Sequence, residues 1–188
     1  ESSNGERRVV NFQNIEKASS IGAEIEIRKK LDFIQDKGLF NDLTFFTNLS
    51  YIKSEVKLAG LSVDSRPLQG QSPYLINAGL QYMNENSGFS ITGLYNRIGH
   101  RIAYVGNATL SNIWENARDV VDIQFGKKIL KNKAELKANF GDILNQKSVF
   151  YFNRDGEDAY DSSIDKNYIS NRFGSNISIS FSYNFSLE

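Results

Sequence analysis

The sequence predicts an all-β fold made of antiparallel up-and-down transmembrane β-barrel strands. The composition favours strands, because 12% of the residues are aromatic and only two are Pro. Several segments alternate apolar with polar side chains, which gives a strand two different faces. The connections between these segments are alternately short and long, as are the periplasmic turns and extracellular loops of outer-membrane barrels.

Whole-chain properties exclude several classes of protein. The 22 basic and 22 acidic residues balance, so there is no general attraction to nucleic acid. The absence of Cys removes disulfides, thiolate catalysis and Cys-ligated metals. The sequence contains no run of about 18 apolar residues, so no transmembrane helix is expected. It also lacks a nucleophile elbow, a phosphate-binding loop and a zinc motif, and we therefore expect no enzyme, no cofactor and no nucleic-acid partner.

The last alternating segment, 173–187, is the most informative strand. Its apolar positions are Phe173, Ile177, Ile179, Phe181, Tyr183, Phe185 and Leu187. The positions between them are Ser or Asn from Asn176 onward, and the segment contains no charged residue. A strand on the surface of a soluble protein usually carries Lys or Glu on its wet face, whereas neutral polar residues suit a barrel lumen. The alternative is the last strand of a soluble sandwich or lipocalin-like barrel.

Six further strands precede this segment. Their expected ranges are 21–33, 43–51, 74–82, 89–95, 121–128 and 134–140, and long loops are expected at 55–72, 106–116 and 147–171. A tight hairpin at Gly38 would place Phe33 opposite Leu43. A two-residue turn between the third and fourth strands would pair Tyr82 with Phe89.

A total of seven strands raises the question of closure. Single-chain bacterial barrels have an even number of strands, and an open edge would leave unpaired backbone groups in lipid. Either an eighth strand lies within residues 7–19, or the chain is the tail of a larger barrel. The start without a signal peptide favours the tail. We therefore take 1–19 as an upstream loop or strand end, and 20–188 as a C-terminal β-barrel segment of about seven antiparallel strands.

Several motifs occur in a recognisable order. They are R-P-L-Q-G-Q-S-P-Y at 66–74, Y-N-R-I-G at 95–99, I-W-E at 113–115, E-L-K at 135–137 and D-I-L-N-Q at 142–146. In this order they resemble the late barrel strands of TonB-dependent outer-membrane receptors. The terminal F-S-Y-N-F at 181–185 is similar to the aromatic-ended last strand that the outer-membrane assembly machinery recognises, although S-L-E follows it in this chain.

The resemblance covers about residues 20–187 and implies the C-terminal part of a 22-stranded barrel with a plug in its lumen. It implies a receptor that takes up a scarce ligand (an iron chelate, cobalamin or a glycan) across the outer membrane of a Gram-negative bacterium. The implied partners are outer-membrane lipid, the plug domain of the full-length protein, the TonB complex through the absent N-terminal part, and the assembly machinery through Phe181, Tyr183 and Phe185. The alternatives are a small self-contained barrel acting as an adhesin or structural protein, and a soluble lipid-binding β-barrel.

Seven residues are candidate ligand or rim contacts, namely Arg66, Arg97, His100, Arg101, Trp114, Asp155 and Asp158. A guanidinium group suits an anionic ligand or a lipopolysaccharide phosphate, and a rim charge paired with a carboxylate is the alternative. The single His is not accompanied by Cys or clustered carboxylates, so a polar surface residue is the alternative to a ligand. The acidic loop 153–165 does not match a calcium-binding loop, because Gly156 follows Asp155 directly. We expect that loop to be flexible and solvated, in a position to touch substrate. The residues expected to face the lumen are Glu24, Glu26, Asp122, Glu135 and Lys137.

Overall fold

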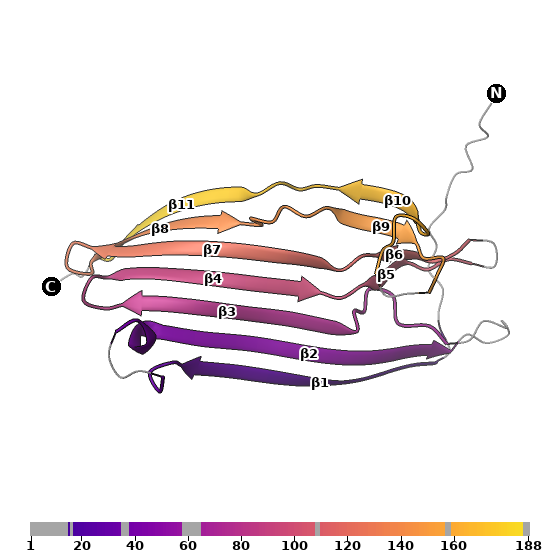
Figure 1. Cartoon of the computed structure of the whole chain (residues 1–188), viewed down its shortest axis with the longest axis horizontal. Coiled ribbons are helices and arrows are strands. Elements are labelled where there is room, and N and C mark those ends of the chain that lie inside the picture. Colours follow the sequence, from indigo (N-terminus) through magenta and orange to yellow (C-terminus); the bar gives the residue numbers. More distant parts are fainter. Residues whose placement is uncertain are drawn as a thin grey trace, which may run out of the picture.

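The computed structural model is all-β and antiparallel, which confirms the predicted fold class at this level (Figure 1). It describes residues 15, 17–34, 38–57, 65–107, 110–156 and 159–185. Within these ranges eleven strands form two sheets, and the helical structure amounts to one turn of 3-10 helix, η1 (Leu39–Asp42). No helix in the described part of the chain is long and apolar enough to cross a membrane.

The larger sheet contains seven strands in the order β1-β2-β3-β4-β7-β8-β11. Their bounds are β1 Lys17–Lys30, β2 Leu43–Lys57, β3 Tyr74–Asn84, β4 Phe89–Ile98, β7 Arg118–Ile129, β8 Ala134–Gly141 and β11 Asn176–Tyr183. Each overlaps one of the seven ranges predicted from alternation. Residues 17–19, predicted as upstream loop or strand end, belong to β1. The rest of the proposed eighth strand, apart from residue 15, lies outside the described residues.

The second sheet continues four of these strands beyond a break. Its strands are β5 Arg101–Tyr104, β6 Ile113–Glu115, β9 Ser148–Phe152 and β10 Lys166–Asn171. The order β10-β9-β6-β5 repeats the order β11-β8-β7-β4, because each short strand directly precedes or follows its long counterpart along the chain. Figure 1 shows this second sheet at one end of the long sheet. The predicted loops at 106–116 and 147–171 therefore contain strands.

The register gives the long sheet two chemically different faces. One face, which we call the apolar face, carries Ile21, Ala23, Ile25, Ile27, Leu43, Phe45, Leu49, Tyr51, Tyr74, Ile76, Ala78, Leu80, Tyr82, Phe89, Ile91, Tyr95, Val121, Ile123, Phe125, Ile129, Ala134, Leu136, Ala138, Phe140, Ile177, Ile179, Phe181 and Tyr183. The opposite face, which we call the polar face, carries Glu24, Glu26, Arg28, Asn48, Asn77, Asn96, Asp122, Gln124, Glu135, Lys137, Asn139, Ser178, Ser180 and Ser182. All five residues predicted to face a lumen are on the polar face.

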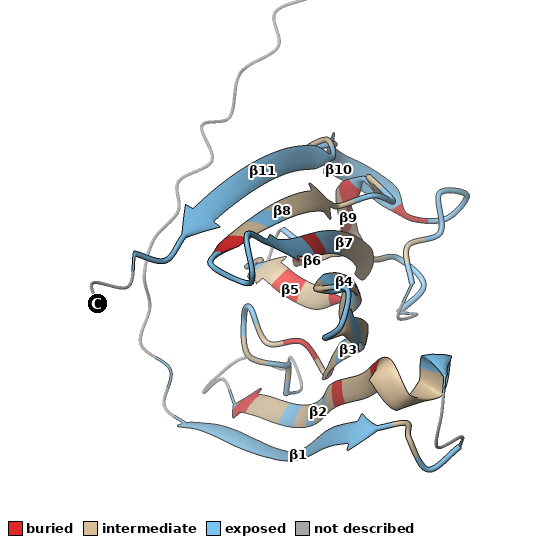
Figure 2. Ribbon diagram, turned by 90° about the vertical axis from the view of Figure 1, so that its left-hand side faces the viewer, coloured by how far each residue is buried: buried red, intermediate tan, exposed pale blue. Residues whose placement is uncertain are grey.

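The long sheet is curved into an open arc, with β1 and β11 at its two ends (Figure 2). β5 and the segment that leads into β3 lie on the inner side of this arc (Figure 2). The segment 65–73 links the polar face to the second sheet: the Leu68 amide donates to Ser54 Oγ on the polar face at 3.0 Å, and the Gly70 amide donates to the Ile102 carbonyl of β5 at 2.9 Å. The polar face is therefore on the inside of the arc, and the apolar face is on the outside.

Two of the predicted hairpin registers are wrong. The Leu31 amide donates a hydrogen bond to the Leu43 carbonyl, so Leu31 and not Phe33 lies opposite Leu43. β1 ends at Lys30, and η1 precedes β2 where a tight turn was predicted. Between β3 and β4 the connection is four residues long, and Phe89 therefore pairs with Asn84. Gly88 supports this longer turn with a φ of 67°, a conformation that costs glycine little.

Candidate functional site

The apolar face is a candidate interaction surface because almost nothing in the described chain covers it. Its side chains on the outer strands are largely exposed: 75% for Ile21, 73% for Ile179 and 68% for Ile177. The fully buried apolar side chains lie elsewhere, at Val56, Ile102 and Tyr151 near the junction of the two sheets. Soluble monomers rarely expose a contiguous apolar patch of more than a few hundred Å², so a face spanning seven strands requires an apolar partner.

The apolar band runs obliquely across the strands. Leu43 is the last residue of the band on β2 at the end of the sheet that bears the short turns. Directly opposite residues on β3, β4, β7 and β8 connect Leu43 with Ile179 on β11. The band on β11 continues four residues further, to Tyr183. A shift of four residues over five strand steps corresponds to a tilt of about 30°, with about 3.3 Å per residue and about 4.8 Å per strand. This slant approaches the 35–45° or so by which strands of membrane barrels are tilted.

Aromatic side chains mark both limits of the band. Tyr51 and Tyr74 are paired at the limit near the second sheet. At the opposite limit the rings of Tyr82 and Phe89 have centroids 6.4 Å apart, and Tyr183 lies on β11. Tyr combines an apolar ring with a polar hydroxyl, which suits a boundary between an apolar and an aqueous medium.

Amide and hydroxyl side chains form cross-strand hydrogen bonds on the polar face. Asn96 Nδ2 donates to Asn77 Oδ1 at 2.5 Å, between β4 and β3. Gln124 Nε2 donates to Asn139 Oδ1 at 2.6 Å, and Asn139 Nδ2 donates to Ser178 Oγ at 3.1 Å. These bonds connect side chains across β7, β8 and β11 without a net charge, so the inner wall is hydrophilic and electrically mixed.

Among the described strands of the long sheet, the polar face carries one aromatic side chain, Phe46, in addition to aliphatic residues such as Leu75 and Leu94. Phe46 packs over Gly79 of the neighbouring strand, and a Cβ added at Gly79 would overlap the ring. The Arg28 guanidinium lies over the same ring, 5.8 Å from its centroid. The missing side chain of Gly79 thus provides the space for Phe46, an arrangement that pins the register of β2 and β3.

Three of the seven candidate contacts meet where the second sheet begins. The rings of His100 and Trp114 have centroids 5.4 Å apart. Arg101 Nε donates to Glu115 Oε2 at 2.8 Å, within the pairing of β5 with β6. Arg101 is therefore paired with a carboxylate on the adjacent strand, the alternative to an anion-binding role.

Arg97 is also paired with a carboxylate, on the outer side of the sheet next to the band. Its Nη1 donates to Asp119 Oδ1 at 2.7 Å. The Tyr95 hydroxyl donates to the same oxygen at 2.7 Å, and Arg97 Nε donates to the Tyr74 hydroxyl at 3.3 Å. The carboxylate was not singled out from the sequence, because only the register of β4 with β7 brings Asp119 opposite Arg97.

A third ion pair lies on the inner side of the break between β8 and β9. Arg118 Nη1 donates to Asp142 Oδ2 at 3.0 Å, and the Asp142 amide donates to Asp122 Oδ1 at 2.8 Å. Asp142 has a φ of 49°, and its Oδ1 is buried without a hydrogen-bond partner in the described structure. This pair holds the chain in the bend between the two sheets.

The remaining candidates do not join this junction group. Arg66 lies in the segment beside the end of β2, where its backbone pairs with Val56, and burial lowers the pKa of its guanidinium. Its Nη1 donates to the Pro67 carbonyl at 3.0 Å. Asp155 is exposed after β9, and Asp158 lies outside the described residues. No group of three or more metal-ligating side chains occurs in the part of the chain that the structure describes.

The acidic loop after β9 is organised by one buried carboxylate. Asp165 is 6% exposed, and its oxygens accept hydrogen bonds from the amides of Arg154 at 2.9 Å and of Asp161 at 3.0 Å. Hydrogen bonds from the Ser163 hydroxyl and amide lower the pKa of Asp161. We predicted a flexible, solvated loop, and these bonds give its described part a defined conformation.

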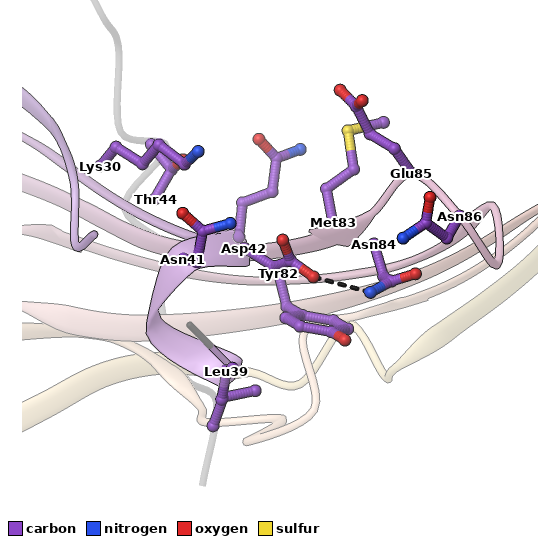
Figure 3. Close-up of a pocket in the computed structure, with 12 residues that line it drawn as sticks. Lys30, Leu39, Asn41, Asp42, Thr44, Tyr82, Met83, Asn84, Glu85 and Asn86 are labelled. Atoms are coloured by element: carbon purple, nitrogen blue, oxygen red, sulfur yellow. Dashed lines mark hydrogen bonds between the residues drawn. The ribbon is translucent and has the colours of Figure 1, made fainter. Parts of the chain in front are cut away.

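A hollow of about 800 Å³ lies at the short-turn end of the sheet (Figure 3). It is bordered by η1, by the end of β1 and by the turn that follows β3. Asn84 Nδ2 donates to Asp42 Oδ2 at 2.7 Å across it (Figure 3). It is an open, polar depression between two turns, and none of the seven candidate residues borders it.

Comparison with protein-family models, with curated proteins and with solved structures finds no match to this chain.

Proposed function

We propose that this chain forms a section of the wall of an outer-membrane β-barrel, with its apolar face in contact with lipid. The observation that carries the proposal is the uncovered apolar face, which continues over seven strands on the outside of the arc. The slant of the band and the Tyr residues at its limits support the same orientation. In a lipid environment the exposed Ile, Leu and Phe side chains need no further protein cover.

The direction of curvature favours this proposal over a soluble lipid-binding barrel. Such a barrel encloses its ligand, so its apolar residues face inward and its polar residues face water. The arc in this chain has the reverse arrangement, with the Asn and Gln ladder inside and the apolar face outside.

A wall section of a large barrel is favoured over a small self-contained barrel. An eight-stranded barrel would need β1 and β11 close enough for one further strand to pair with both, and Figure 2 shows them on opposite sides of a wide opening. Within the described part of the chain, β1 and β11 each pair with a strand on one side only, and an unpaired backbone group costs several kcal/mol in lipid. Further strands of the full-length protein would complete these edges.

Within this class we propose a TonB-dependent receptor, on the strength of the ordered motifs at 66–74, 95–99, 113–115 and 142–146. The second sheet, with its ion pairs and loops, forms part of the extracellular rim that captures a scarce ligand, an iron chelate, cobalamin or a glycan. The polar face borders the lumen that holds the plug. TonB acts on that plug, and the ligand passes along the inner wall.

Cysteine scanning of β11 tests the lipid contact, because the sequence has no native Cys. Single Cys substitutions at 177–182 are labelled with a small fluorophore in the full-length protein, reconstituted with lipid that carries a nitroxide on its acyl chain. We expect quenching at the odd positions and little quenching at the even ones. Equal quenching at both sets, or none at either, would contradict the proposed orientation.

The size of the natural polypeptide tests the larger assignment. An antibody against residues 147–171 is used on outer-membrane fractions that are run boiled and unboiled. A heat-shifting band several times larger than 21.3 kDa is expected for a receptor. A heat-shifting band near 21.3 kDa would support a small complete barrel and remove the transport proposal.

A further inference from the structure

The outer side of the sheet carries a group of lysines where the apolar band ends on β1 and β2. Lys57 pairs directly with Lys17 across the two strands, and Lys53 pairs with Ile21. By the register these lysines share a face with Tyr51, and they lie beyond it, at the end that bears the second sheet (Figure 1). All three lysines are exposed.

This lysine group has no neutralising partner in the described structure. Within the described ranges, no carboxylate lies within 4.0 Å of the Nζ atom of Lys17, Lys53 or Lys57. Glu55 is on the same face, opposite Ser19, and it leaves the group with a net charge of about +2. Like charges directly opposite each other in an antiparallel pair are destabilising, so the Lys17–Lys57 pairing favours the binding of an anion between the two lysine side chains.

Three arginines near the second sheet, in contrast, each have a carboxylate partner. Arg97, Arg101 and Arg118 each form an ion pair with an acidic residue at 3.0 Å or less. Among the described residues, these three arginines at the junction of the sheets thus have a carboxylate within 3.0 Å, whereas the three lysines have none within 4.0 Å.

We propose that Lys17, Lys53 and Lys57 bind the phosphate of a lipid headgroup. This inference rests on the proposed function, because it requires lipid against the apolar face. A lipid phosphate bound here would lie between the ammonium groups, and the acyl chains of the same lipid would lie against the apolar band on the other side of Tyr51. Lysine suits this role, since its flexible stem and compact charge follow a mobile anion.

Electron spin resonance of lipid around the reconstituted full-length protein tests the inference. Nanodiscs of phosphatidylcholine contain either spin-labelled phosphatidic acid or spin-labelled phosphatidylcholine as the probe. The immobilised fraction of each probe is measured for the unmodified protein, for the variant Lys17→Gln, Lys53→Gln, Lys57→Gln, and for a control variant. The control, Lys29→Gln, Lys127→Gln, Lys131→Gln, removes the same charge from the opposite end of the sheet.

We expect the unmodified protein and the control to immobilise phosphatidic acid in preference to phosphatidylcholine. In the first variant this preference should fall at least about fivefold, because one lysine near a lipid surface contributes about that much. An equal loss in both variants, or no preference in the unmodified protein, would overturn the inference. Loss of the preference when inorganic phosphate is added at the same concentration as the probe would assign the site to free phosphate. Absence of any immobilised lipid would instead contradict the proposed membrane function.

Discussion

Replacing Ile179 by Lys places a charge in the middle of the apolar band on β11, an edge strand of the sheet. Ile179 is 73% exposed in the isolated sheet and lies between Ile177 and Phe181 on the same face. If that face contacts lipid, a Lys near the bilayer midplane lowers the free energy of unfolding by about 2–4 kcal/mol. If it contacts water, a Lys at so exposed a position changes that free energy by no more than about 0.5 kcal/mol.

The structure identifies a matched control on the same strand. Ser182 is on the polar face and pairs with Glu135, so Ser182→Lys adds a charge opposite a carboxylate. Ser180 is less suitable, because it pairs with Lys137 and a second Lys there would add a like-charge penalty of about 0.2–1 kcal/mol. The two variants therefore differ in the medium that surrounds the new ammonium group.

Equilibrium unfolding by guanidinium in phosphatidylcholine vesicles, followed by far-ultraviolet circular dichroism, measures the difference. We expect the Ile179→Lys protein to be less stable than the Ser182→Lys protein by about 2–4 kcal/mol. Equal stabilities of the two variants would refute the assignment of the apolar face to lipid, even if both proteins inserted into the vesicles.

Two more predictions concern packing and pH. Gly79→Ala should lower the free energy of unfolding by about 1–3 kcal/mol because the new Cβ overlaps Phe46, and adding Phe46→Ala should remove most of that cost. The control Gly93→Ala meets open space and should change the free energy of unfolding by no more than about 0.5 kcal/mol. Similar losses at both glycines in the same unfolding assay would contradict this packing. The Asp161 carboxylate, whose pKa the Ser163 hydrogen bonds lower, should stabilise its turn above an unfolded pKa of about 3.9 and lose that effect as the pH falls through the lower folded pKa. An NMR titration of the Asp161 side-chain carbon should show this lower midpoint, and a midpoint unchanged by Ser163→Ala would argue against the hydrogen bonds as its cause.

The seven long strands were predictable because each has two faces in different surroundings. A period of two residues in polarity survives in the sequence wherever one face is apolar over seven or more residues, as on β3 or β8. The four strands of the second sheet carry no such signal. β6 has three residues and β5 has four, too few to show a period.

Registers and ion pairs were harder to predict than strands. The pairing of β3 with β4 depends on a four-residue turn, in which the Asn84 side chain accepts a hydrogen bond from the Ser87 amide, and a two-residue turn fits the alternation equally well. Arg97 and Asp119 are 22 residues apart and face each other only through the register of β4 with β7. The sequence could identify the arginine as a candidate but could not identify its partner.

The aligned breaks in four strands have a consequence for how the chain can vary. β4, β7, β8 and β11 are all interrupted at the same end of the long sheet, and hydrogen bonding resumes beyond the interruption in a separate sheet. An insertion or deletion between β5 and β6, or between β9 and β10, would alter the second sheet without shifting the register of the long sheet. The second sheet can therefore diversify in length and shape during evolution, while the pairing that sets the apolar band remains unchanged.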